Sequence, residues 1–380
     1  MAKLGDLFTL QMGKTPSRAN SDYWDNGNNP WVSIADLSSY NKYVGETKET
    51  ISDLAVLESG IKEVPGKTVI MSFKLSIGKV AITKAPVYTN EAIMAFIPNG
   101  KTEVFPDYLF YLFSGKDWNK GTNRAVMGAT LNKATLSELE IFLPSLDEQR
   151  EISEKLDKVN MLIDLRQKQL EKLDELVKSR FIEMFGDFDL SHQKKNWKPI
   201  SDVGTVVGGA TPKTNIEEYW NGEYRWISPA ELKQDSGIIY DSVKKITKAG
   251  IDSCSLQELP IGTVILSSRA PIGKVAIAGT TFYCNQGFKN IICKDTIRPC
   301  FLYSLLLFNT EYLNSLGRGA TFKEISKAIV ENIKIPVPDI NSQIKYESFV
   351  AQTDKSKLAV QKSLEQLETL KKSLMQKYFG

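Results

Sequence analysis

The stretch Ile77–Ile82 reads Ile-Gly-Lys-Val-Ala-Ile and occurs a second time, unchanged, at Ile272–Ile277. Other short matches follow in the same order at an offset of about 195 residues, which indicates an internal duplication. They pair Thr15-Pro16 with Thr211-Pro212, Tyr23-Trp24 with Tyr219-Trp220, Trp31–Ser33 with Trp226–Ser228, Gly128–Thr130 with Gly319–Thr321 and Phe185-Gly186 with Phe379-Gly380. Units of this length are too long for a solenoid, and each can bury a core of its own.

The first part of each copy runs from about Lys3 to Leu146 and from about Trp197 to Pro338, and its pattern is mixed and rich in strands. Gly66–Phe73 is a β-prone run after a Pro-Gly turn. Phe105–Phe113 is almost wholly apolar and is expected to form a buried helix that begins at Pro106. These patterns predict an α+β globular domain in each copy.

The second part of each copy is predicted to be one long helix. Asp147 to Phe185 contains no Pro or Gly, and its apolar residues alternate at spacings of three and four, as in a coiled-coil seam. The predicted seam positions are Ile152, Leu156, Val159, Ile163, Leu170, Leu173 and Val177 in the first helix, and Val350, Val360, Leu364, Leu367 and Leu374 in the second. Thr353, Lys357 and Lys371 interrupt the second seam. We expect the two helices to cover each other, because neither apolar stripe is stable alone. The alternative is that each helix lies across its own globular domain.

The predicted division of the chain is therefore a domain over residues 1–146, a long helix over 147–186, a second domain over 187–338 and a second long helix over 339–380. Hydrophobic residues make up 42% and charged residues 24% of the chain, as in ordinary globular proteins. No apolar run is long enough to span a bilayer, and Met1–Asp6 has no signal-peptide core, so a cytoplasmic location is predicted. The net charge of only +3 means that any DNA-binding surface has to be a local patch.

Common catalytic and metal-binding signatures are missing. Cys254, Cys284, Cys293 and Cys300 form no Cys-x-x-Cys pair and have no histidine nearby, so free thiols are expected and no metal site. The only histidine, His192, lies in a polar connection and cannot build a catalytic triad. Gly13-Lys14-Thr15 lacks the earlier glycine of a phosphate loop. No motif of a base methyltransferase or a nuclease was found, so a non-enzymatic binding role is predicted, without catalytic residues.

The ordered set of motifs resembles the specificity subunit of bacterial Type I restriction-modification systems, over essentially the whole chain. The marks are two Gly-x-Thr-Pro loops, each followed by Tyr-Trp and then by Trp-Val/Ile-Ser, together with the repeated Ile-Gly-Lys-Val-Ala-Ile and Gly-Ala-Thr segments. Leu143–Gln149 and Ile335–Ile340 each open a long helix and complete the set. One departure is that Asn196–Ile200 has no counterpart at the start of the chain.

The resemblance implies a pseudo-twofold α+β protein, in which two similar target-recognition domains are separated by two long antiparallel coiled-coil helices. Each domain would read one half of a bipartite site on double-stranded DNA, and the helices would set the gap between the halves. It also implies two methyltransferase (modification) subunits and restriction/translocase subunits as partners. The chain would have no cofactor of its own, because the partners would bind S-adenosylmethionine, ATP and Mg.

The polar loops of the two domains are the candidate DNA surface, since base edges and phosphates are read by Arg, Lys, Asn, Gln, Ser and Thr. The candidates are Lys14, Thr15, Arg18, Lys74, Lys79, Arg124 and Lys133 in the first domain, and Lys213, Thr214, Arg225, Arg269, Lys274, Arg318 and Lys323 in the second. Lys74/Arg269 and Lys79/Lys274 hold matching positions and suit phosphates. Arg18 and Arg225 differ between the halves and are better candidates for base reading. For any one of them, a solvated surface charge is the alternative.

Other interpretations remain open at the level of the sequence. Trp24, Trp31, Trp220 and Trp226 suit base stacking, but they recur beside apolar residues and are expected to be core anchors. The Gly-Ala-Thr pair is either a turn that approaches the DNA backbone or a plain structural turn. The alternative functions are a scaffold that joins two copies of a protein partner without touching DNA, and a cryptic enzyme within the globular domains.

Overall fold

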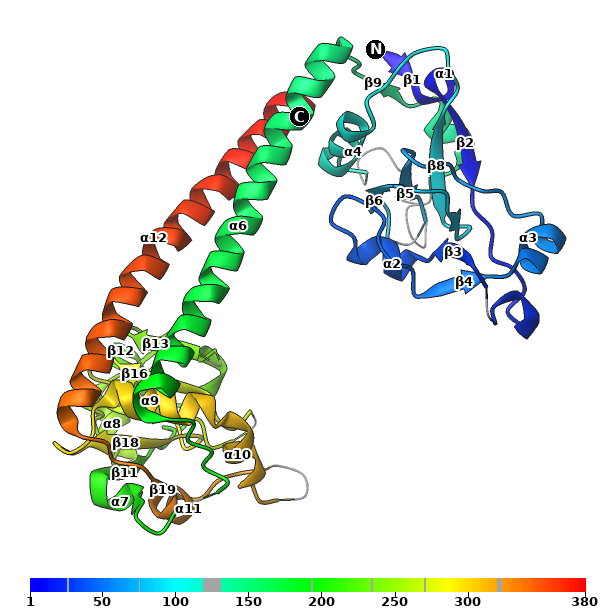
Figure 1. Ribbon diagram of the computed structural model, residues 1–380. Coiled ribbons are helices and arrows are strands. Elements are labelled where there is room, and N and C mark those ends of the chain that lie inside the picture. Colours follow the sequence, from blue (N-terminus) through cyan, green and yellow to red (C-terminus); the bar gives the residue numbers. More distant parts are fainter. Residues whose placement is uncertain are drawn as a thin grey trace. The chain divides into compact units, whose positions relative to one another are not determined.

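The computed structural model describes residues 1–25, 27–74, 76–118, 131–192, 194–233, 235–269, 271–319 and 323–380. They form two compact units, and each unit contains one globular body and part of both long helices. Unit 1 comprises Met1–Gln167 and Lys362–Gly380, and unit 2 comprises Lys168–Gln361. The first long helix, α6 (Leu146–Phe185), and the second, α12 (Ile340–Phe379), therefore contribute to both units (Figure 1).

The body of unit 1 is built on an antiparallel sheet with the order β2-β8-β5-β6. Its strands are β2 (Phe8–Met12), β8 (Ile93–Pro98), β5 (Val69–Ser72) and β6 (Val80–Ile82). Helix α4 (Pro106–Gly115) covers this sheet and buries Tyr108, Leu109 and Phe113 in the core between them. The helix predicted to begin at Pro106 is confirmed.

Smaller elements complete unit 1. A second sheet has the order β4-β3-β7, in which β3 and β7 are parallel. The remaining bounds are β1 (Ala2–Lys3), α1 (Leu4–Leu7), η1 (Ser21–Tyr23), β3 (Asn29–Val32), α2 (Ile34–Ser39), β4 (Glu49–Ile51), α3 (Asp53–Ser59), β7 (Tyr88–Thr89), α5 (Lys133–Ser137) and β9 (Glu140–Ile141). Strand β1 pairs with β9, which ties the start of the chain to the segment just before α6.

The body of unit 2 repeats this plan, with one strand added. Its main sheet has the order β11-β18-β15-β16-β13, and its second sheet has the order β14-β12-β17. The bounds are β10 (Lys198–Pro199), α7 (Ile200–Val203), β11 (Gly204–Gly208), η2 (Glu217–Tyr219), β12 (Trp220–Ile227), η3 (Pro229–Glu231), β13 (Asp235–Ile239), β14 (Lys244–Ile246), α8 (Lys248–Ser253), β15 (Val264–Leu266), β16 (Val275–Ala278), β17 (Tyr283–Cys284), β18 (Lys289–Cys293), α9 (Pro299–Phe308), α10 (Thr310–Ser315), α11 (Lys327–Asn332) and β19 (Lys334–Ile335).

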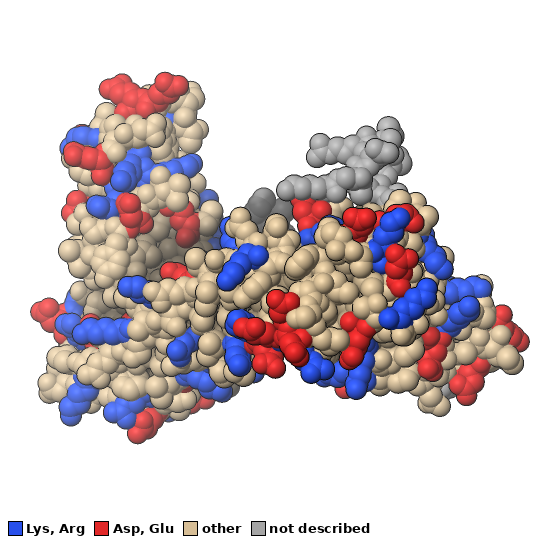
Figure 2. Space-filling model, turned by 90° about the horizontal axis from the view of Figure 1, so that it is seen from above, with Lys and Arg blue, Asp and Glu red and all other residues tan. Residues whose placement is uncertain are grey.

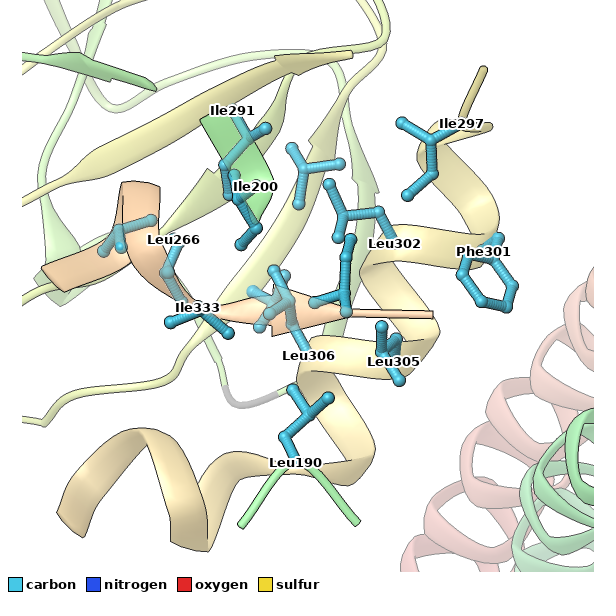
Figure 3. Packing of buried hydrophobic residues seen from close by; sticks show 14 of the residues in the cluster. Leu190, Ile200, Leu266, Ile291, Ile297, Phe301, Leu302, Leu305, Leu306 and Ile333 are labelled. Carbon is cyan, nitrogen blue, oxygen red and sulfur yellow. The ribbon is translucent and has the colours of Figure 1, made fainter. Parts of the chain in front are cut away.

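Helix α9 supplies much of the core of unit 2. Phe301, Leu302, Leu305 and Leu306 of α9 are fully buried and belong to one core cluster with side chains of the main sheet such as Leu266 and Ile291 (Figure 3). A helix that is apolar on nearly all sides has to be enclosed. Here the sheet covers one side of α9, and aromatic side chains of α6 and α12 cover another.

The two long helices are antiparallel. In unit 1, Leu156 near the start of α6 shares a core cluster with Leu374 near the end of α12, whereas Arg166 donates to Ser363 Oγ over 3.2 Å. In unit 2, Asp174 forms an ion pair with Lys357. Phe181, further along α6, packs edge-on against Tyr346, which lies earlier in α12. Later residues of α6 thus contact earlier residues of α12, as in an antiparallel pair. The predicted antiparallel pair is confirmed.

The predicted seam serves two purposes. Val159, Ile163, Val360 and Leu364 are buried, although they belong to neither main core cluster. Ile152, Leu156 and Leu374 instead pack into the core under α4, and Val177 and Val350 pack against the core under α9. Each body therefore receives one end of both helices in addition to their pairing, which differs from the alternative in which each helix lies across its own domain.

A buried glutamine fixes the start of each long helix. The Gln149 side chain accepts from the Phe105 backbone N–H over 2.9 Å and donates to the Pro144 carbonyl over 2.9 Å. Gln343 repeats both bonds at 2.8 Å, with Arg298 as donor and Pro338 as acceptor. Because buried amides need all their partners, this pair of bonds sets the angle at which the helix leaves the body.

Candidate nucleic-acid interface

Loops gather at one end of the main sheet in each unit, and we call this the loop end. In unit 1, Met12 at the end of β2 pairs with Met94 at the start of β8, and Ser72 at the end of β5 pairs with Ile93. The loop end therefore carries residues 13–16, 90–92, 73–74 and 76–79. In unit 2, Gly208 pairs with Lys289 and Ser267 bridges to Phe288, which brings residues 209–213, 285–288, 268–269 and 271–274 to this end.

Two hydrogen bonds that Ser72 makes at the end of β5 are repeated by Ser267, which follows β15. Ser72 Oγ accepts from the Lys79 backbone N–H over 3.0 Å and donates to the Ser76 carbonyl. Ser267 repeats this with Lys274 over 2.8 Å and with Pro271 over 2.8 Å. Gly78 and Gly273 follow with φ of 86° and 88°, a region that favours glycine. Lys79 and Lys274 are thus presented from equivalent, hydrogen-bonded turns.

The Gly-x-Thr-Pro loop packs tightly on the segment before β8. Thr15 Oγ1 donates to Glu91 and accepts from Asn90 Nδ2 over 3.1 Å. In unit 2, Thr211 Oγ1 donates to Gln286 Oε1 over 2.5 Å. The side chain of Lys14 donates to the carbonyl of Ser59. The threonine of each copy therefore has a polar partner that differs between the two units.

Alanine at Gly13 or Gly209 is expected to destabilise the unit that contains it by about 1–3 kcal/mol, because the added Cβ has no room. It would lie 2.2 Å from the Thr89 carbonyl oxygen at Gly13, and 2.2 Å from the Asn285 carbonyl oxygen at Gly209. The measurement is the thermal unfolding midpoint. Gly208→Ala is the matched control, since a Cβ there meets nothing within 4 Å. Equal midpoints for Gly208→Ala and Gly209→Ala would contradict the steric argument.

The loop end of unit 2 holds a charged cluster. Arg269 Nε lies 3.0 Å from Glu324 Oε2, and Lys289 Nζ lies 3.3 Å from Glu324 Oε1. The backbones of Arg318 and Glu324 exchange two hydrogen bonds of 3.0 and 3.1 Å. These bonds bring Arg318 to this end as well, together with Lys323, the residue before Glu324. Burial acts to raise the pKa of Glu324, but hydrogen bonds from Arg269 and Lys289 outweigh it and lower that pKa.

The two predicted base-reading residues lie at the second sheets instead, Arg18 in a turn that contacts β4 and Arg225 within β12. Arg18 forms a double hydrogen bond with Glu49 and stacks 3.6 Å from the centre of the Trp24 ring. The Arg18 side chain lowers the pKa of Glu49 by hydrogen bonding to it. Arg225 Nε lies 3.2 Å from Asp241. Both arginines are thus tied to a carboxylate of the same unit.

The other candidates are dispersed. Lys213 and Thr214 are exposed in the loop that leads from the loop end to β12. Lys74 is half-buried beside the Phe73 ring at the loop end. Lys133 begins α5, which contacts α1, and Arg124 lies outside the described residues, as does Gly128–Thr130.

The four tryptophans are anchors within the second sheets. Trp31 and Trp226 are buried, and each indole N–H donates to a loop carbonyl, of Lys14 over 3.0 Å and of Ala210 over 3.1 Å. Trp24 and Trp220 pack edge-on against them with ring centres 5.1 Å apart. The expectation that they are core anchors holds in the structure, and these indoles hold the Gly-x-Thr-Pro loops in place.

Sequence reasoning missed several loop-end residues. Asn90 and Glu91 in unit 1, and Asn285 and Gln286 in unit 2, stand at matching positions beside the threonines. Asn90-Glu91 and Asn285-Gln286 are separated by the same offset as the other repeated motifs, and this recurrence could have identified them from the sequence. Lys289 and Glu324 had no such signal, because their pairing joins segments that are distant in the sequence.

Residues of both charges occur across the face drawn in Figure 2, and neither sign forms one continuous surface there. Among the residues that the structure describes, no group of three or more His, Cys, Asp or Glu side chains is placed to hold a metal ion. Within the same residues, no helix has both the length and the apolar character needed to cross a membrane. Burial raises the pKa of the Cys284 thiol to about 12.

Comparison with known protein families identifies the family to which both copies of the duplicated chain belong. The description "Type I restriction modification DNA specificity domain" matches the chain twice, over residues 1–175 and 194–369. The chain belongs to the Type I restriction-modification DNA specificity family. The resemblance inferred from the motifs is therefore confirmed, and a scaffold that contacts no DNA is not favoured.

Relatives and solved structures agree with this assignment. This chain is 38% identical to the MjaIX specificity subunit of Methanocaldococcus jannaschii over 209 residues, which are 54% of this chain and 48% of that one. It is 28% identical to the putative MjaX specificity subunit of the same organism, over 79% of this chain and 73% of that one. The chain thus spans about half the length of the first relative.

The fold is that of solved specificity subunits. A chain from a study of complex assembly and conformational transition of the type I R-M system matches with a TM-score of 0.65, at 18% identity, over 100% of this chain and 96% of that one. The S subunit from M. genitalium matches with a TM-score of 0.59, at 15% identity, over 100% and 95%. At these identities the likeness shows the fold, which confirms two similar α+β domains and a pair of long helices.

Proposed function

We propose that this protein reads a bipartite target on double-stranded DNA and positions the other subunits of a Type I system on it. The observation that carries the proposal is the duplicated loop end. One chain presents two polar surfaces of the same architecture whose side chains differ, as two unlike half-sites require. Family membership supports DNA as the ligand.

Within each loop end, matching and differing residues have different roles. Lys79 and Lys274 project from equivalent turns and suit phosphates, which are the same in every sequence. Positions that change between the copies, such as Glu91 and Gln286, suit base edges. Lys79 is exposed, whereas Lys274 already donates to the Pro229 carbonyl over 3.0 Å.

The long helices are proposed to set the gap and to bind partner subunits. A helix of 40 residues is about 60 Å long, enough to separate two recognition surfaces. On the unit 1 part of α6, Met161, Leu162 and Leu165 are exposed apolar side chains that suit a protein partner. We assign two methyltransferase subunits and the restriction/translocase subunits as partners. The specificity chain itself is non-catalytic in this proposal, and S-adenosylmethionine, ATP and Mg bind to the partners.

The test is co-expression with the methyltransferase subunit of the same system, followed by base-resolution mapping of adenine methylation. We expect methylation at one bipartite motif with a fixed gap. A stable complex without motif-specific methylation would support a scaffold and overturn the recognition role. Absence of any complex would argue against the assembly part of the proposal.

Alanine at Lys79 is expected to weaken DNA binding by the assembled complex equally for all sequences, and to reduce the slope of log affinity against log salt by about one. Lys274→Ala is expected to act in the same direction but less strongly, because Pro229 already holds its ammonium group. Binding titrations over a range of salt concentrations measure both. Lys101→Ala is the control, since Lys101 is exposed beyond the opposite end of the sheet, after β8. An unchanged salt slope in Lys79→Ala would remove its phosphate role.

A further inference from the structure

The loop ends of the two units carry different cations at one matching position, which is Lys74 in unit 1 and Arg269 in unit 2. The Lys74 ammonium lies 5.2 Å from the Phe73 ring centre. Arg269 is held by Glu324, and its side chain is 47% exposed. A lysine is a flexible point charge, whereas arginine presents a planar fork of donors. The same position thus carries an ammonium group in one unit and a guanidinium paired with a carboxylate in the other.

The backbone around Arg269 is fixed from both sides. Arg269 and Glu324 form an antiparallel bridge, and the Ile325 N–H donates to the Ser268 carbonyl over 2.9 Å. On the other side, the Ser268 N–H donates to the Gly287 carbonyl over 2.8 Å. The carboxylate and the guanidinium are therefore held opposite each other by main-chain bonds as well as by their ion pair.

The Glu324 carboxylate is itself braced. Lys289 Nζ lies 3.3 Å from Glu324 Oε1 and 3.3 Å from Ser268 Oγ, and the Lys289 side chain is only 13% exposed. In unit 1, Met94 stands where Lys289 stands, since Met12 pairs with Met94 as Gly208 pairs with Lys289. The brace is therefore a property of unit 2.

The contact geometry of Arg269 suits guanine. Glu324 Oε2 lies 3.0 Å from Arg269 Nε, and a guanidinium also carries donors on its two terminal nitrogens. A pair of donors in a rigid plane matches the O6 and N7 acceptors of guanine in the major groove. We propose that Arg269 reads a guanine in the half-site recognised by unit 2, and that Glu324, braced by Lys289, is the positioning residue that orients it. This inference rests on the proposed function and adds a specificity-determining residue to it.

The first experiment maps adenine methylation by the assembled complex for Arg269→Ala, Arg269→Lys and Lys74→Ala. We expect Arg269→Ala to lose discrimination at one guanine of one half-site, by about 5- to 150-fold, and to leave the other half-site unchanged. Arg269→Lys is expected to keep the overall level of methylation but not the guanine preference. It also keeps the test informative if Arg269→Ala assembles poorly. Lys74→Ala is the matched control, expected to lower methylation without changing the motif.

The second experiment measures binding to a duplex that carries 7-deazaguanine, which lacks the N7 acceptor, at the affected position. We expect the unsubstituted protein to bind this duplex about 10-fold more weakly, and Arg269→Ala to bind both duplexes equally. Glu324→Ala is expected to reduce the guanine preference while retaining part of it, since the arginine remains but loses its orientation.

The outcomes separate this inference from the proposed function. A uniform loss of methylation in Arg269→Ala with an unchanged motif would make Arg269 a phosphate contact, and would leave bipartite recognition intact. An unchanged preference in Glu324→Ala would remove the positioning role. Absence of a bipartite motif for the unsubstituted protein would overturn the proposed function, and this inference with it.

Discussion

Replacing Phe181 by alanine is expected to destabilise unit 2 by about 3–5 kcal/mol, the largest effect of any single change considered. Phe181 of α6 is 2% exposed, and five aromatic rings surround it with centres 5.2 to 6.4 Å away. These rings are Phe185, Phe188, Phe301, Phe308 and Tyr346. The substitution removes a large buried side chain and leaves a cavity at the point where α6, α9 and α12 meet.

Scanning calorimetry measures this effect, because it can distinguish the unfolding of one unit from that of the other when the two do not unfold together. The transition of unit 2 is expected to move to lower temperature, while that of unit 1 moves less. Ile182→Ala is the control, since Ile182 is the next residue of α6 but is 39% exposed. If Phe181→Ala and Ile182→Ala shifted the transition equally, Phe181 would not be the packing centre of unit 2.

Replacing Lys42 by alanine is expected to cost unit 1 about 2–3 kcal/mol, because two carboxylates lose their shared cation. Lys42 Nζ lies 2.6 Å from Asp107 on α4 and also pairs with Asp157 on α6, and the Lys42 side chain is 14% exposed. Broken buried pairs cost about 3–5 kcal/mol, but Asp157 is 44% exposed, so solvent reduces the loss. The measurement is the urea unfolding midpoint.

Two tyrosines complete this network and keep their protons at neutral pH. Tyr43 donates to Asp107 over 2.8 Å, and burial raises its pKa to about 12. Tyr111 donates to Asp157 over 2.5 Å, and its pKa is raised by burial and by that carboxylate. The control is the triple variant K42M/D107N/D157N, which removes the cation together with both negative charges. It is expected to recover part of the loss. A triple variant as unstable as Lys42→Ala would show that the loss of a cation shared by two carboxylates is not the cause.

The sequence predicted well wherever the deciding signal was local or repeated. Absence of Pro and Gly, together with the spacing of apolar residues, predicted α6 and α12. Helical periodicity can be recognised from the sequence of a few successive turns, without knowledge of distant residues. The repeated Ile77–Ile82 segment revealed the duplication and aligned the turns that present Lys79 and Lys274. Recurrence of the tryptophans beside apolar residues predicted anchors, and Trp31 and Trp226 are buried.

Prediction was weaker where a residue's role depends on distant partners. Leu156 and Val159 fit one helical stripe, yet Leu156 packs into the core under α4 and Val159 lies outside both main core clusters. Periodicity identifies the apolar face of a helix, but it does not say what covers that face. For the same reason Lys42, which joins a loop to α6 over 115 residues, gave no signal in the sequence.

The sequence by itself determined that the chain is duplicated, that each copy joins an α+β domain to a long helix, and that its motifs are those of a DNA specificity subunit. These features rest on periodicity and recurrence, which are properties of the order of residues. Only the tertiary structure decided which loops share one end of the sheet, and that Glu324 lies between Arg269 and Lys289. Strand order and direction set those neighbours, and pairing between distant strands is fixed by packing of the whole domain rather than by any local pattern.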